Sequence, residues 1–406
     1  MKKSNLLLFV IFMLVLNTCG KFSPPLFKKS PEIINNNNTS TPLTAFIDFE
    51  THRPIDSVIV NITDGQRETV LRYDQGNKTR LGFLLKYMIP NIEHNISLSL
   101  KDSSGRIYEV KEKLLFTPPA LPQEDFLFPK IVITKNTIPT EEKLTLINPR
   151  RRGNVLQNTG NSFNQMYGLL VIVNQKGEVL WYYQNNSRIS DFDLLPNGNI
   201  SYITQDNKIT EIDFAGNVIG QWYAAQRPQG EDKQAIPVDT PTFHHDTALL
   251  PNGNRLVLST ESRKIDSYYS SELDSQAPLK KQNVMGDVVV EFNPKGEIVH
   301  QWNTFDHMPV MRIGYETFSN FWIRRGFSDT IDWTHANAIV PIENEDAYLV
   351  NFRYQSAMVK VNKKTGAIEW IFAENSGWGE KLKDKLISLP ENGLNWHQHS
   401  PRFTQS

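Results

Sequence analysis

Three of the nine histidines occupy the same position of a repeated sequence pattern. The pattern is a short apolar segment that ends in a proline-containing turn, and His245 and His335 each lie six residues before that proline. His399 begins a further copy. Converging imidazole groups can bind a metal ion, exchange protons or attack an electrophile. Because chance alone would rarely place three histidines at one repeat position, we expect them to share a functional site.

The repeat also predicts the elements that would hold these histidines. One half reads SDFDLLPNGN, HDTALLPNGN or HANAIVPIEN, and Ser190 stands at the histidine position of the first copy. The other half is an apolar strand, a glycine turn and a strand with tryptophan, at residues 171–183, 210–222, 290–302 and 359–372. Repeats of about 40–50 residues with four strands are typical of β-propeller blades. We therefore expect propeller blades, with the tryptophans packed between their sheets.

Inner strands line the central channel of a propeller, so the three histidines should meet there. Long connectors lead into each of them, over residues 223–242, 303–332 and 374–396, whereas the connector before Ser190 is short. We expect the middle connector to form a lid, since long loops over a rigid scaffold often build a site. Its aromatic residues are Tyr315, Phe318, Phe321, Trp322 and Phe327.

Residues next to the histidines are candidates for substrate binding. Phe243, Trp333 and His397 each lie two residues before a repeat histidine, and side chains two apart on a strand share a face. We expect them to form a partly aromatic wall that could hold an aryl ring, although core packing is an equal alternative. His244 should point to the face opposite His245.

Arg353 helps to distinguish a metal site from an anion site. Three histidines could bind zinc, but an unpaired guanidinium beside a dication would be repelled. The same guanidinium offers paired donors that suit a tetrahedral oxyanion. We therefore expect no metal, and an anionic group that is bound or transferred.

The N-terminus carries the features of a secreted lipoprotein. A basic start and the apolar run LLLFVIFMLVL precede Cys19, which predicts a signal peptide over residues 1–19 and a lipidated cysteine. Residues 20–41 are rich in proline, lysine and asparagine and predict a flexible tether. We expect a periplasmic or cell-envelope location, with an anchor in the outer membrane.

Two β-rich regions follow this predicted tether. Alternating apolar residues predict a small antiparallel β-sandwich over residues 42–122, and the propeller would occupy residues 123–406. The formal net charge of −1 argues against nucleic acid as a partner. The chain has no phosphate-binding glycine motif, so we expect no nucleotide and no other cofactor.

The segments HHDTALLPNGN, DWTHANAIV, NFRYQSAMVKV and QHSPRF together resemble the bacterial arylsulfate sulfotransferases over residues 43–406. The resemblance implies an all-β chain in which a β-sandwich precedes a six-bladed propeller. About four blades and the start of a fifth are present, which implies a C-terminally truncated and poorly active form. The partners implied are an aryl sulfate donor, a phenolic acceptor and a membrane reached through the lipid anchor, and a homodimer is allowed.

The same resemblance implies roles for individual residues. His399 matches the nucleophile that carries the sulfuryl group, and His245, His335 and Arg353 match its helpers. His244 stays open as the alternative to His245. Two other functions also stay open, namely a non-catalytic envelope-binding propeller and a histidine-ligated metalloenzyme.

Overall fold

The computed structural model describes residues 26–123, 128–135, 143–150, 166–389, 393 and 396–401. The chain divides into two compact units that interleave in sequence. The first unit consists of Met1–Ile33, Ile47–Phe83 and Asn95–Leu115, and the second of Ile34–Phe46, Leu84–His94 and Phe116–Ser406. The boundary expected near residue 122 is therefore replaced by several crossings of the chain between the units.

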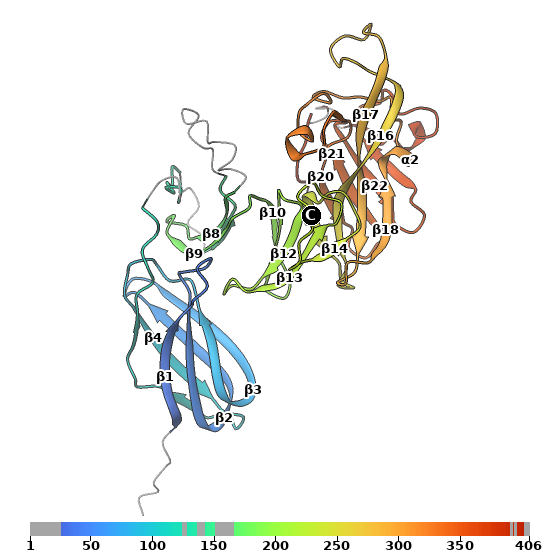
Figure 1. The fold of residues 1–406 in the computed structure, drawn as a ribbon. Helices are drawn as coiled ribbons and strands as arrows, with labels where there is room; N and C mark the ends of the chain where they lie inside the picture. Colours follow the sequence, from blue (N-terminus) through green and yellow to red (C-terminus); the bar gives the residue numbers. More distant parts are fainter. Residues whose placement is uncertain are drawn as a thin grey trace, which may run out of the picture. The chain divides into compact units, whose positions relative to one another are not determined.

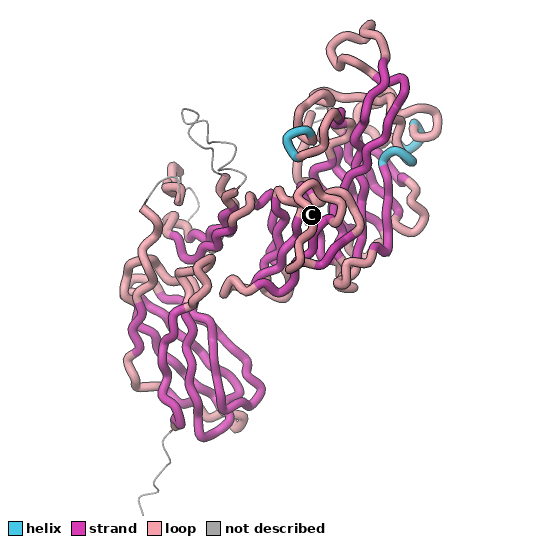
Figure 2. The backbone as a smooth tube through the Cα atoms, viewed as in Figure 1, coloured by secondary structure: helices cyan, strands magenta, loops and turns pink. Residues whose placement is uncertain are grey.

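Strands dominate both units, as Figure 2 shows. Six strands form the N-terminal sheet, in the order β1-β2-β4-β5, with β3 on β2 and β6 on β4. The long strand β2 pairs with β1, β3 and β4, whereas β5 and β6 pair with β4. The six strands of this sheet are β1 Phe27–Asn35, β2 Ala45–Thr63, β3 Glu68–Leu85, β4 His94–Lys101, β5 Ile107–Glu109 and β6 Leu114–Phe116.

The tether expected over residues 20–41 is wrong for its described part. Residues 27–35 form β1, and the asparagine-rich stretch that follows is an ordered turn. Asn36 and Asn38 accept hydrogen bonds from backbone amides two residues ahead, while Thr41 Oγ1 donates to the Ala215 carbonyl at 2.7 Å. Asparagine side chains often fix such turns, which a reading based on composition misses.

The second unit is built from four antiparallel sheets of consecutive strands (Figure 1). Three of them contain a four-stranded meander, the order of a propeller blade, and the first sheet has three described strands. The first sheet contains β7 Thr145–Ile147, β8 Gly168–Val173 and β9 Val179–Asn185, and the second β10 Ile189–Leu194, β11 Ile200–Thr204, β12 Lys208–Ile212 and β13 Val218–Ala224. The third contains β15 His244–Leu249, β16 Arg255–Tyr268, β17 Lys280–Phe292 and β18 Ile298–Asn303, and the fourth β20 Ala336–Pro341, β21 Ala347–Phe352, β22 Ala357–Asn362 and β23 Ile368–Phe372.

Tryptophans on the outer strands connect each blade to the next. Trp181 Nε1 donates to the Phe214 carbonyl at 2.9 Å, and Trp222 Nε1 to that of Pro294 at 3.0 Å. Trp302 Nε1 donates to the Gly366 carbonyl at 2.9 Å. Each acceptor lies in or beside the turn between the two outer strands of the following blade. The predicted packing role is therefore confirmed for these three tryptophans.

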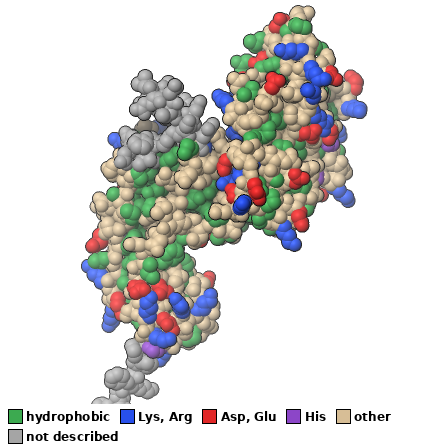
Figure 3. Space-filling model, in the orientation of Figure 1, with side chains coloured by type: hydrophobic (Ala, Val, Ile, Leu, Met, Phe, Trp, Pro, Cys, Tyr) green, Lys and Arg blue, Asp and Glu red, His purple; other side chains and the backbone are tan. Residues whose placement is uncertain are grey.

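The connectors carry the remaining elements. Strand β14 (Ile236–Val238) adds to β13, and β19 (Thr330–Asp332) adds to β17, both in parallel. The expected lid contains helix α2 (Thr304–His307) and the 3-10 helix η2 (Ile323–Arg325). A second 3-10 helix, η3 (Lys383–Lys385), follows β23. Within the described residues, no helix is long and apolar enough to cross a membrane. Figure 3 shows basic and acidic side chains intermixed on the visible face.

Candidate functional site

The inner strands of neighbouring blades place the repeat histidines close together. Strands β10, β15 and β20 lie side by side. His245 is the second residue of β15, and His335 directly precedes β20. The ring of His245 lies 4.8 Å from that of His335 and 6.1 Å from that of His399, measured between centroids. The predicted convergence of the three histidines is thus observed.

Both strand histidines adopt a backbone conformation that disfavours their residue type. His245 has φ 56° and His335 has φ 49°, in the left-handed region. The register of both strand pairs shifts at these points. A residue with a side chain pays about 1–2 kcal/mol for this conformation. Its occurrence at the same repeat position in two blades indicates that the geometry of these two rings is selected.

An acidic partner orients His335. Asp332 Oδ2 lies 2.6 Å from His335 Nδ1, so Nδ1 carries a proton that the carboxylate accepts. Tyr354 stacks on the other side of the ring at 4.3 Å. The hydrogen bond at Nδ1 leaves Nε2 as the nitrogen available for chemistry, and the carboxylate stabilises positive charge on the imidazole when it takes a second proton.

His244 supports His245 rather than replacing it. Two oxygens face His244 Nε2, the Ser259 carbonyl at 3.1 Å and Asp287 Oδ1 at 3.2 Å, so Nε2 carries the proton. In the neutral ring Nδ1 is then an acceptor, and it lies 2.9 Å from His245 Nδ1, which must donate. His245 consequently keeps Nε2 as its basic nitrogen. Of the two candidates, His245 lines the cavity and His244 is not among its lining residues, which favours His245 as the helper.

Asparagines of the last described blade hold the segment that carries His399. The Gln398 carbonyl accepts hydrogen bonds from Asn337 Nδ2 at 3.0 Å and from Asn351 Nδ2 at 2.8 Å. His399 is itself exposed at the cavity, with Ser400 Oγ 3.3 Å from Nδ1. Two amide contacts to one carbonyl fix the backbone beside the nucleophile candidate. The repeat did not reveal these two asparagines.

Local electrostatics keep two of the three rings neutral. Partial desolvation, followed by the positive potential of His335, Arg353 and Arg150, lowers the pKa of His399 below its usual 6.5. Desolvation and the neighbouring histidines lower the pKa of His245 much further. A neutral imidazole has the free electron pair that nucleophilic attack needs.

We expect the acidic limb of the pH–rate profile to lie below pH 6.5, because attack by His399 is lost only when its ring is protonated. Since these pKa values are lower in the folded than in the unfolded state, their contribution to stability is complete above about pH 6.5 and is lost as pH falls. Turnover and thermal unfolding between pH 5 and pH 8 measure both effects. An acidic limb centred above pH 7 would contradict the assignment.

Arg353 lies beside the histidines but is paired. Its Nη1 is 2.5 Å from Glu316 Oε2, and its backbone amide donates to the His335 carbonyl at 3.1 Å. The hydrogen bond from Arg353 is the main reason that the pKa of Glu316 is lowered. Glu316 belongs to the expected lid, so the arginine is held by the lid in this structure.

Two of the three residues expected to form a substrate wall are core residues. Phe243 is fully buried and stacks on Phe292 at 5.7 Å, and Trp333 is fully buried with its Nε1 bonded to the Arg312 carbonyl. The prediction of a shared face fails because the left-handed residue two positions later breaks the strand alternation. His397 is half-buried and stacks on Tyr315 at 5.5 Å, so it remains a candidate for substrate contact.

The aromatic surface near the histidines comes instead from the expected lid. Phe321 stacks on His245 at 5.4 Å and meets His335 edge-on at 4.4 Å. It lines a cavity of about 590 Å³ together with His245 and His399. The connector over residues 303–332 therefore reaches the histidines, as expected of a lid.

Four arginines that sequence analysis did not select also line this cavity. They come from three segments far apart in sequence, and no repeat or motif marks them. Other polar residues of this wall include Asp191, Asp246 and Asn337. The arginines are Arg150, Arg188, Arg324 and Arg325.

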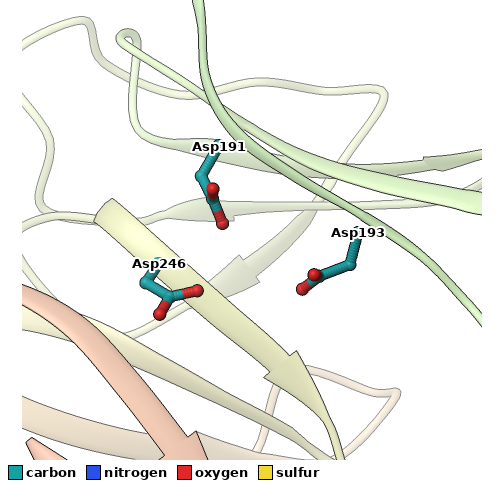
Figure 4. Close-up of side chains that lie close together, drawn as sticks. All are labelled: Asp191, Asp193 and Asp246. Atoms are coloured by element: carbon teal, nitrogen blue, oxygen red, sulfur yellow. The ribbon is translucent and has the colours of Figure 1, made fainter. Parts of the chain in front are cut away.

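A group of three carboxylates lies on the inner strands, as Figure 4 shows. Asp191 and Asp193 of β10 approach Asp246 of β15, with ligand atoms within 4.8 Å of one another. Among the described residues, this group has the spacing of a possible metal site. Desolvation and the nearby Asp246 raise the pKa of Asp191 to about 9, so the two carboxyl groups share a proton at neutral pH.

Some predicted features lie outside the described residues. These are the signal peptide over residues 1–19 with Cys19, the start of the tether, and residues 402–406 after the QH motif.

The strand order and the histidine-lined cavity define the second unit as a β-propeller with a candidate catalytic site. A family model, Arylsulfotransferase (ASST), matches residues 130–406, which is more than half of the chain. The chain therefore belongs to the arylsulfotransferase family, as the sequence segments indicated.

Other comparisons add likenesses of low similarity. No curated protein sequence matches the chain. Among solved structures, it is similar to a protein of unknown function from Bacteroides caccae, with 11% identity over 80% of this chain and 96% of that chain and a TM-score of 0.30. Hydrazine synthase of Kuenenia stuttgartiensis has 10% identity over 85% of this chain and 80% of that chain, with a TM-score of 0.30. BamB of Moraxella catarrhalis has 9% identity over 84% of this chain and 87% of that chain, with a TM-score of 0.26. The fold assignment rests on the strand order and the family match.

Proposed function

We propose that the protein transfers a sulfuryl group from an aryl sulfate to a phenol, with His399 as the covalent carrier. The observation that carries the proposal is the meeting of His245, His335 and His399 beside one cavity of a chain from the arylsulfotransferase family. The lowered pKa of His399 supports its role as the nucleophile.

In the first half-reaction, the neutral His399 ring attacks sulfur and forms an N–S bond. The bond between sulfur and the aryl oxygen breaks, and its electron pair goes to that oxygen. A protonated His335, stabilised by Asp332 at 2.6 Å, gives its Nε2 proton to the departing phenolate. Lid residue Phe321 supplies an apolar surface for the aryl ring.

The second half-reaction reverses these steps with the acceptor. Its hydroxyl proton returns to His335 Nε2, its oxygen attacks sulfur, and the N–S electron pair returns to His399. His245 Nε2, left basic by its contact with His244, is the alternative nitrogen that could take this hydroxyl proton in place of His335. Charge on the sulfuryl oxygens needs a cation, and Arg353 can provide one if Glu316 releases it.

Incubation with 4-nitrophenyl sulfate, with and without added phenol, tests the proposed function. We expect nitrophenol release that depends on phenol and a matching amount of phenyl sulfate. Nitrophenol release at the same rate with and without phenol would indicate a hydrolase. Absence of release would leave the non-catalytic binding protein as the better reading.

Arg353→Lys is expected to lower kcat/KM by about 100-fold, because an ammonium cannot reproduce the paired hydrogen bonds of a guanidinium to two sulfuryl oxygens. Steady-state kinetics of the purified variant measure this. Arg263→Lys is a suitable control, since Arg263 is ion-paired with Glu261 on β16 and does not line the cavity. Turnover of Arg353→Lys near that of the wild type would remove Arg353 from the site.

We also propose that the protein works in the cell envelope as a lipoprotein. The basic start, the apolar run and Cys19 support this location. Labelling of expressing cells with a radioactive fatty acid tests it, with Cys19→Ser as the unlabelled control.

A further inference from the structure

The cavity beside the histidines carries an excess of positive charge. Four arginines line it, and Asp191 and Asp246 are its only acidic lining residues within the described chain. These two carboxyl groups share one proton, because the pKa of Asp191 is raised to about 9. Asp246 Oδ2 also accepts a hydrogen bond from the Ile339 amide at 2.9 Å, so this oxygen already has a donor.

Two of these arginines have no carboxylate partner among the described residues. Arg188 lies in the connector between β9 and β10, and its Nε is buried without a hydrogen-bond partner. Arg325, at the end of η2, lies over the Phe321 ring at 4.2 Å. The carboxylate that acts on the pKa of Arg325 is Asp332, whose Oδ2 is already engaged by His335.

Burial and neighbouring arginines lower the pKa of both guanidinium groups. Desolvation is the largest cause of the lowered pKa in both groups. The second cause is the positive charge of another arginine, which is Arg150 for Arg188 and Arg188 for Arg325. Both pKa values fall to about 10, which leaves the groups charged at neutral pH. Like charges held together in a cavity without counter-ions favour a bound anion.

Arg188 and Arg325 line the cavity, whereas Arg353, which was expected to hold the sulfuryl oxygens, does not. His399 is influenced by Arg353 and Arg150, whereas His245 is influenced by Arg325. Phe321 contacts both a histidine and one of these arginines. Its ring stacks on His245, and the Arg325 guanidinium lies over the same ring. A ligand beside Phe321 in this cavity would therefore lie near both His245 and Arg325.

We propose that Arg188 and Arg325 form a second anion subsite, so that the preferred donors are aryl sulfates with a further anionic group on the ring. This inference rests on the proposed sulfuryl transfer. The recognised chemistry is an anionic oxygen group, which a carboxylate or a second sulfate ester can supply.

The test compares kcat/KM for three donors: 4-nitrophenyl sulfate, its ring-carboxylated form and an aryl ring with two sulfate esters. We expect the wild type to favour at least one dianionic donor by about 10-fold or more, the usual gain from hydrogen bonds to a charged group. The preferred donor identifies the anion. In Arg188→Gln and Arg325→Gln the ratio between dianionic and plain donors should fall several-fold, and Arg325→Lys should restore part of it. Arg263→Gln should keep the wild-type ratio.

Equal kcat/KM values for all three donors in the wild type would overturn the subsite while leaving sulfuryl transfer intact. Transfer from none of them would instead overturn the proposed function. Since the wild-type comparison needs no variant, a folding defect in either glutamine variant leaves the inference testable. An unchanged ratio in both folded variants would also overturn it.

Discussion

Replacement of His399 with asparagine is expected to abolish the covalent intermediate and to lower turnover by about 10³-fold or more, because a nucleophile that acts in a two-step transfer has no substitute. Asparagine keeps a polar side chain of similar reach but cannot carry the sulfuryl group. Mass spectrometry of protein quenched with an aryl sulfate donor should find one SO₃ unit on His399 of the wild type and none on the variant.

A matched control separates this effect from the loss of any histidine. His52 is exposed on β2 of the N-terminal sheet, so His52→Asn should retain both the adduct and the turnover. An adduct on His245 or His335 in the wild type would refute the assignment of His399. Full activity of His399→Asn would refute covalent catalysis at this residue.

Asp287→Asn is expected to lower kcat by about 100-fold and to destabilise the fold by about 2–4 kcal/mol. Asp287 is buried, with Oδ1 3.2 Å from His244 Nε2 and Oδ2 accepting from the Ala336 amide at 2.6 Å and from Thr334 Oγ1. All three neighbours donate, and an amide presents only one accepting oxygen. The variant therefore turns one hydrogen bond into a clash between donors.

Asp287 is a positioning residue, so its test needs more than a loss of rate. It holds the turn before β20 and fixes the tautomer of His244, which in turn sets that of His245. We expect kcat to fall more than KM rises, and the pH–rate profile to shift as the tautomers change. Asp266→Asn, at an exposed ion pair with Lys281, is the control. An Asp287→Asn enzyme with lower thermal stability but an unchanged pH profile would show a purely structural role.

The blades could be predicted because their signals are local and repeated. Apolar alternation, glycine turns and the even spacing of the tryptophans encode strands and their faces directly. The inter-blade bond from Trp302 to Gly366 satisfies that expectation in detail. The ordered turn at Asn36 and Asn38 was missed because asparagine composition resembles that of a tether, whereas the side-chain hydrogen bonds depend on conformation.

The candidate site could be predicted only in part. The repeat position selected His245, His335 and His399 correctly as neighbours, since equivalent strand positions meet at the propeller axis. The face predicted for Phe243 and Trp333 from strand alternation was wrong, because the local sequence does not indicate that the histidine two residues later has a left-handed backbone. A glycine would have been the usual signal for that conformation.

By itself, the sequence determined the family, the succession of blade strands and the candidate histidines for the proposed sulfuryl transfer. Tertiary structure alone decided which partners those residues have. The contacts of His244 with Asp287, of Arg353 with Glu316 and of Arg325 with Phe321 join segments far apart in the chain. Strand periodicity is a property of neighbouring residues, whereas tautomers, ion pairs and unpaired cations depend on groups brought together only when the blades close around one cavity.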